Sequence, residues 1–134
     1  MSISQLSCGR RTLDMSRTQV MGILNVTPDS FSDGGRLAHL SDVVTKATAM
    51  ACDADILDIG GESTRPGAQE VTIADEINRV VPAIMAIRDA GILTPISVDT
   101  RKAAVASAAI AAGANMVNDV SAMRFDPEMA AVVA

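Results

Sequence analysis

Four short apolar runs recur along the chain, and each one ends in polar or turn-forming residues. The runs cover Val20–Val26, Ile56–Gly60, Ile96–Thr100 and Met116–Val120. Continuous apolar runs of this length are typical of strands that are buried on both faces, as in parallel sheets. The pattern therefore predicts four strands of a parallel sheet.

Helical spacing fills the gaps between the predicted strands. Apolar residues recur at three- and four-residue intervals over Ser41–Cys52 and most clearly over residues 73–87. A third helix is expected over Lys102–Ala112, and a fourth is expected to begin at Asp126. The expected N-caps are Ser41, Thr72, Thr100 and Asp126, and the expected residues at the helix ends are Asp53, Gly91 and Gly113.

The order of these elements predicts the class of fold. Strands that alternate with helices form a parallel sheet with right-handed crossovers. An open Rossmann sheet and a TIM barrel both fit four such units, but the sequence contains neither the dinucleotide fingerprint G-x-G-x-x-G nor a P-loop. A TIM barrel carries its active site at the carboxyl ends of the strands, and polar residues stand there in this sequence. These residues are Asn25, Asp58, Asp99, Asn118 and Asp119.

We therefore predict an α/β fold that is the N-terminal half of a (β/α)8 TIM barrel. Residues 19–134 are expected to form about four βα units, and residues 1–18 a short hairpin that closes the bottom of the barrel around Cys8. Together they are expected to form a single incomplete domain, 1–134.

Composition narrows the class of protein. The 134-residue chain has a formal net charge of −5, and its 11 basic residues are dispersed, so no nucleic-acid partner is predicted. The two cysteines, Cys8 and Cys52, lack metal-type spacing. No apolar run reaches the length of a membrane span, and no signal peptide opens the chain. We expect a cytoplasmic protein with free thiols and no membrane partner.

Two polar loops follow the first two predicted strands. The loop Asn25–Gly35 is long and has Phe31 at its middle, and the loop Gly60–Ala68 holds Arg65 in front of Pro66. Proline restricts the backbone of the preceding residue to extended conformations, which would hold the arginine for a carboxylate or phosphate. Loops of this kind act as lids or substrate clamps, and ordinary surface loops are the open alternative.

The strand ends offer groups that bind ligands. A carboxylate at Asp99 can accept two N–H groups from a guanidine-like ring edge, and the amide of Asn118 both donates and accepts. A buried ion pair for Asp99 and a satisfied core amide for Asn118 are the structural alternatives. Asn25 offers a neutral oxygen to Mg²⁺ or caps a turn. Asp58 either faces the barrel mouth or pairs with a neighbouring strand.

The stretches MGILNVTPDSFSDGG, DIGGESTRPGA, ISVDTRK and NDVSA closely resemble the dihydropteroate synthase family of pterin-binding TIM barrels. The resemblance runs from about residue 18 onward. It implies a transferase of folate and tetrahydrofolate biosynthesis, and a target of sulfonamides. The implied reaction condenses 6-hydroxymethyl-7,8-dihydropterin diphosphate with 4-aminobenzoate to give 7,8-dihydropteroate and diphosphate, without a covalent catalytic residue from the protein.

The resemblance also implies the roles of individual residues. It implies a magnesium cofactor, with Asn25 as its metal-binding residue. It places the pterin diphosphate on Thr64, Asp99 and Asn118. It places 4-aminobenzoate and the loops that close over it on Phe31, Asp33, Arg65 and Pro66.

Members of the resembled family are considerably longer, and their later strands supply further residues to the pterin and cations to the diphosphate. The chain is therefore expected to be truncated and inactive alone, and the full-length form is expected to be a homodimer. Two alternatives stay open. One is a pterin-binding methyltransferase-type barrel, and the other is a non-enzymatic module whose half barrel dimerises through its open edges.

Overall fold

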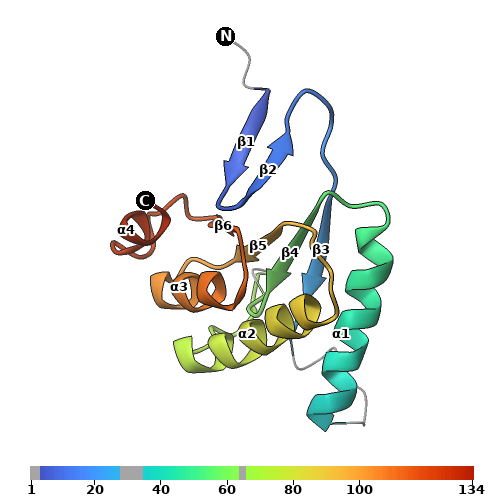
Figure 1. Ribbon diagram of the computed structural model, residues 1–134. Coiled ribbons are helices and arrows are strands. Elements are labelled where there is room, and N and C mark those ends of the chain that lie inside the picture. Colours follow the sequence, from blue (N-terminus) through green and yellow to red (C-terminus); the bar gives the residue numbers. More distant parts are fainter. Residues whose placement is uncertain (1–3, 28–34, 64–65) are drawn as a thin grey trace.

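The computed structural model describes residues 4–27, 35–63 and 66–134 (Figure 1). Strands β3 (Met21–Asn25), β4 (Ile56–Gly60), β5 (Ile96–Asp99) and β6 (Met116–Asn118) form a four-stranded parallel sheet in that order. Helices α1 (Gly35–Ala51), α2 (Ile73–Asp89), α3 (Ala103–Ala112) and α4 (Met129–Val133) follow the four strands in turn. The predicted alternation of strands and helices is confirmed.

The main hydrophobic core lies between one face of this sheet and the helices. Leu57 and Ile59 of β4 and Ile96 and Val98 of β5 are fully buried, together with an apolar stripe of α2 that includes Ile84. Successive side chains of a strand point to opposite faces, so the residues between them point away from the helices. Burial of each large aliphatic side chain stabilises the fold by about 1.5–3 kcal/mol.

The opposite face of the sheet is open at β3. Met21 and Ile23 point to this face and are 40% and 61% exposed. Within the described residues, β3 and β6 each pair with a neighbour on one side only. No helix in these parts of the chain is both long enough and apolar enough to cross a membrane.

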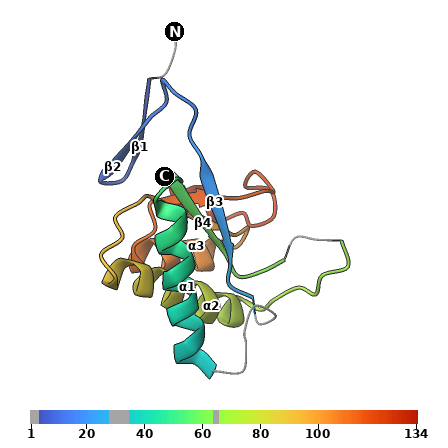
Figure 2. The ribbon, with the colours of Figure 1, turned by 90° about the vertical axis from the view of Figure 1, so that its right-hand side faces the viewer.

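The predicted N-terminal hairpin is confirmed. Strands β1 (Gln5–Cys8) and β2 (Arg11–Asp14) pair antiparallel around a tight turn, in which Gly9 has a φ of 61°. Cys8 and Leu13 pack on the first residue of β4, Ile56, and contact Met116 at the start of β6. The hairpin therefore covers the N-terminal ends of the strands, opposite their carboxyl ends (Figures 1 and 2).

The ends of α2 and α3 agree with the sequence pattern. The hydroxyl of Thr72 accepts a hydrogen bond from the Asp75 amide at 3.1 Å, as expected of an N-cap. Gly91 and Gly113 follow the two helices with φ values of 82° and 127°, which L-residues with a side chain rarely adopt.

The expected start of α1 is wrong, and so is the expected conformation of Asp53 after its end. The helix begins at Gly35 rather than after Ser41, because residues 36–40 are mostly good helix formers and include no proline. At the other end, Asp53 does not take a left-handed conformation, and its amide instead donates to the Met50 carbonyl at 3.0 Å.

The expected caps of α3 and α4 are also wrong. Thr100 does not cap α3; instead one carboxylate oxygen of Asp126 accepts from the Ala103 amide at 2.7 Å. The other oxygen of Asp126 accepts from the Glu128 amide at 3.0 Å, and α4 itself starts only at Met129. One carboxylate thus serves the start of α3 and the turn before α4, which ties the β6–α4 segment to α3.

Candidate functional site

Four residues form one row across the carboxyl ends of the strands. The parallel register pairs Asn25 with Gly60, Gly60 with Asp99, and Asp99 with Asn118. We call these four residues the mouth row. Residues in register share a face of the sheet, and this row points to the face that the helices do not cover. The structure therefore brings together Asn25, Asp99 and Asn118, three of the residues selected from the sequence.

Gly60 sets the spacing within the mouth row. A Cβ atom at this position would lie 3.4 Å from the Cβ of Asp99 and 3.7 Å from the side-chain oxygen of Asn25. Without a side chain at Gly60, the floor between the carboxylate and the amide stays open. A ligand can therefore approach the backbone closely at this point.

A second row lies one layer deeper and contains Asp58, which was expected either to face the barrel mouth or to pair with a neighbouring strand. Asp58 is in register with Ser97, and Ser97 with Met116. The Asp58 carboxylate, on a residue only 3% exposed, accepts hydrogen bonds from the Ser97 hydroxyl and from the Asn118 side-chain nitrogen, which lies 3.3 Å from Oδ2. Asp58 therefore pairs with Ser97 of the neighbouring strand β5 and with Asn118 of the next strand, β6.

The electrostatic environment of Asp99 is unusual for a carboxylate. Burial, followed by repulsion from Asp58, Glu76, Asp119 and Glu62, raises its pKa from 3.8 to about 6. A carboxylate among other carboxylates is stabilised by a ligand that brings N–H donors or positive charge. Perturbed groups of this kind concentrate at functional sites.

A buried ion-pair cluster lies behind the second loop, and sequence reasoning missed it. The ammonium of Lys102 donates to Glu62 at 2.9 Å, to Glu76 at 2.7 Å and to the carbonyl of Val71 at 2.7 Å. Glu62 also accepts from the Val71 amide at 2.8 Å, and Thr100 donates to Glu76 at 2.6 Å. Both ends of the segment 62–71 are thereby fixed to one ammonium group. The only signal of this cluster in the sequence was that Glu62 lies in the stretch DIGGESTRPGA and Lys102 in the stretch ISVDTRK.

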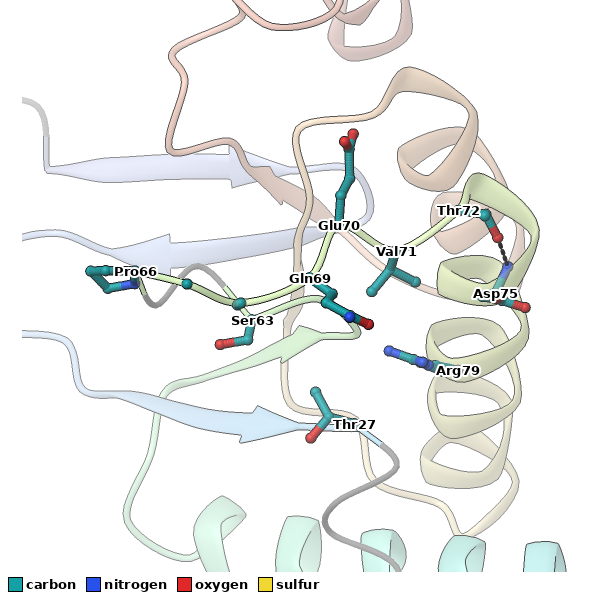
Figure 3. A pocket seen from close by; sticks show the side chains of 11 residues that line it. Thr27, Ser63, Pro66, Gln69, Glu70, Val71, Thr72, Asp75 and Arg79 are labelled. Atoms are coloured by element: carbon teal, nitrogen blue, oxygen red, sulfur yellow. Dashed lines mark hydrogen bonds between the residues drawn. The ribbon is translucent and has the colours of Figure 1, made fainter.

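A cavity of about 620 Å³ opens beside this segment, between the ends of β3 and β4 and the start of α2 (Figure 3). Gln69 and Arg79 point toward one another across it, and Thr27 and Ser63 also line it. Arg79 donates to the Gly61 carbonyl at 2.9 Å. Figure 2 shows the described parts of the β4–α2 segment extending away from the sheet.

The loop residues selected from the sequence are only partly covered by the structure. Pro66 is exposed and lines the cavity. Phe31, Asp33, Thr64 and Arg65 lie outside the described residues. The roles expected for them stay predictions.

The chemistry of Asn25 fits a hard cation that takes few protein ligands. Asn25 is exposed and its side-chain oxygen lies beside Gly60, and Mg²⁺ prefers oxygen ligands and keeps several of its waters. Within the described parts of the chain, no group of three or more His, Cys, Asp or Glu side chains could hold a metal by itself. A magnesium ion here would therefore take most of its ligands from water and a bound substrate.

A half barrel with a polar row at the carboxyl ends of its strands has the architecture of a TIM-barrel enzyme. The comparison with protein families is more specific. The family described as pterin binding enzyme matches residues 21–134, and the chain belongs to that family.

Relatives named dihydropteroate synthase are among the proteins that this chain matches. The enzyme of Synechocystis is 52% identical over 119 residues, which are 88% of this chain and 41% of that protein. The Xanthomonas albilineans dihydropteroate synthase solved with 4-aminobenzoic acid has a TM-score of 0.89 and 48% identity, and the match covers 99% of this chain and 48% of that one. The same enzyme solved with 7,8-dihydropteroate has a TM-score of 0.81 and 45% identity, over 96% of this chain and 46% of that one. The chain thus spans less than half the length of these relatives.

Proposed function

We propose that this chain carries the first half of the active site of a dihydropteroate synthase. One observation carries the proposal. The mouth row sets Asp99, whose carboxylate lacks a cationic partner within the described residues, beside the amide of Asn118 at the carboxyl ends of the strands. The likeness to relatives solved with 4-aminobenzoic acid and with 7,8-dihydropteroate supports it.

In the proposed reaction, Asp99 and Asn118 hold the pterin ring by its nitrogen-rich edge. An ionised carboxylate accepts two N–H groups in one plane, a geometry that an amino-substituted pyrimidine ring supplies. Such hydrogen bonds to a charged group are each worth about 1.5–3 kcal/mol. Because its pKa is raised, Asp99 gains more from this partner than an exposed carboxylate would.

Asn25 is the proposed ligand of Mg²⁺, on the same face as the ring site. When bound, Mg²⁺ would supply charge stabilisation for the diphosphate leaving group. This chain would contribute one neutral ligand, the side-chain oxygen of Asn25, beside Gly60, where the backbone carries no side chain.

The reaction itself requires no protein nucleophile. The bond between the pterin methylene carbon and the diphosphate oxygen breaks, and diphosphate leaves with the electron pair. The amine nitrogen of 4-aminobenzoate forms the new bond to that carbon and then loses a proton. The loops, Thr27–Gly35 and Ser63–Ala68, are proposed to bind 4-aminobenzoate and to keep water from the electrophilic carbon.

The test is to offer the product of the complete gene two alternative substrate sets. With 6-hydroxymethyl-7,8-dihydropterin diphosphate and 4-aminobenzoate, we expect equal amounts of dihydropteroate and diphosphate. Binding of methyltetrahydrofolate alone, without formation of dihydropteroate, would instead establish the methyltransferase-type alternative. Cytoplasmic location, a homodimeric full-length form and sulfonamide binding stay predictions.

A further inference from the structure

We propose that buried Asp58 is a positioning residue that fixes the side-chain amide of Asn118, so that its oxygen faces the mouth of the barrel. Two acceptors, on Asp99 and Asn118, would then face the ligand and select a heterocycle edge that is rich in N–H donors. This inference rests on the proposed function and deepens it, because it names the edge of the ring that the site accepts.

The Asp58 side chain reaches Asn118 from one row deeper, across the intervening strand β5. Asp58 lies one row deeper than the mouth row and is 3% exposed, and its neighbour Ser97 is 1% exposed. The Asn118 nitrogen lies 3.3 Å and 3.4 Å from the two carboxylate oxygens, so it bridges them. Within the described residues, Asp58 is the only side chain that hydrogen-bonds the Asn118 side-chain amide.

The chemistry of the pair permits one orientation of the amide. An ionised carboxylate only accepts hydrogen bonds, whereas an asparagine amide has a donating nitrogen and an accepting oxygen. With the amide reversed, three oxygens would meet without a proton between them, since the Ser97 hydroxyl already donates its proton to Asp58. A buried acceptor without a donor is costly, so the nitrogen faces Asp58 and the oxygen faces outward.

Asp58→Asn removes this constraint with little change of shape. An asparagine at position 58 can donate or accept, so Asn118 can turn either way. We expect the wild-type protein from the complete gene to prefer 6-hydroxymethylpterin over the analogue with a carbonyl oxygen in place of the 2-amino group. Calorimetric titration should show that Asp58→Asn reduces this preference roughly tenfold, the value of one hydrogen bond.

Two further variants separate positioning from general structural loss. Asp55→Asn removes a carboxylate at the other end of the same strand, where Asp55 binds Arg17 and the Val20 amide, and should leave the preference unchanged. The exchange Asp58→Asn with Asn118→Asp restores the pair in the opposite direction and again presents an acceptor to the ligand. It should recover the preference, and an unchanged preference in Asp58→Asn would overturn the inference.

A measurement without ligand keeps the inference separate from the proposed function. In the wild type, NMR should show that the side-chain amide protons of Asn118 exchange with solvent more slowly than those of exposed Asn78. The slow exchange should be lost in Asp58→Asn. Equally fast exchange at the two asparagines of the wild type would overturn the inference. Failure of the wild type to bind either pterin compound would contradict the proposed function only.

Discussion

Replacement of Lys102 by methionine should destabilise the protein more than any surface charge change. The Lys102 side chain is 6% exposed and gives all three ammonium protons to Glu62, Glu76 and the Val71 carbonyl. Methionine keeps most of the apolar stem but leaves the Glu76 carboxylate, 1% exposed, without a counter-ion, and leaves the Glu62 carboxylate, 9% exposed, with only Arg101 at 3.4 Å. Breaking a buried pair in this way costs about 3–5 kcal/mol. This is a large share of the roughly 5–15 kcal/mol that stabilises a typical domain.

Urea unfolding followed by circular dichroism measures this loss. The matched control is Lys46→Met, because Lys46 pairs with Asp42 at 3.1 Å while both side chains are 51% exposed. An exposed pair one helical turn apart is worth only about 0.3–0.5 kcal/mol. Equal losses of unfolding free energy in the two variants would refute the view that burial makes the Lys102 pairs important.

The pH dependence of Lys102→Met gives an independent check with a definite sign. In the wild type, burial raises the pKa of Glu62, but hydrogen bonds from Lys102 and Val71 outweigh burial and lower it below 4.5. This contribution to stability is present above pH 4.5 and is lost as the pH falls through the lower folded-state pKa. Without the hydrogen bond from Lys102, burial favours the protonated form of Glu62. The free energy of unfolding of the variant should therefore rise as the pH is lowered from 7 toward 5. In the wild type the ion pair between Lys102 and Glu62 should give no such rise.

Three further expectations concern the sheet. The pKa of Asp99 is raised from 3.8 to about 6, so the folded protein binds this proton more tightly than the unfolded chain does. The contribution of Asp99 to stability should therefore fall as the pH rises from about 4 to about 6. The melting temperature of Asp99→Asn should lack this decrease with pH. Gly61→Ala, whose Cβ would lie 3.0 Å from Val80, should lose about 1–3 kcal/mol in urea, whereas Gly60→Ala, with 3.4 Å to Asp99, should lose less. Size-exclusion chromatography should show that the 134-residue chain self-associates. Ile23→Lys should reduce this association, because Ile23 is an apolar side chain that is 61% exposed. A monomer at all concentrations would contradict this expectation.

The sequence predicted the strands and most helices because each is encoded locally. A continuous apolar run such as 56–60 specifies a strand buried on both faces, and the stripe of 73–87 specifies a helix with one buried side. The polar residues at the strand ends were also identified correctly as neighbours. In a parallel sheet, consecutive strands bring their carboxyl ends to one edge, so their positions follow from the topology alone.

The rest depends on partners that are distant in the sequence. The start of α3 is capped by Asp126, 23 residues after Ala103, although Thr100 stands closer in the chain. Lys102 meets Glu62 from 40 residues away, and each charge taken alone resembles an ordinary solvated residue. Local sequence patterns specify helices and strands, but their caps and buried ion pairs form only when the helices and strands pack together.

The most direct test of the proposed ring site is calorimetric titration of the complete gene product with 6-hydroxymethylpterin, for the wild type and for Asp99→Asn. Saturable binding by the wild type is expected, with an affinity that falls as the pH drops below about 6, where Asp99 takes up a proton. Asp99→Asn should bind roughly tenfold or more weakly at neutral pH and should lose that pH dependence. Equal affinity of the two proteins at every pH would contradict the assignment of Asp99 to the pterin ring.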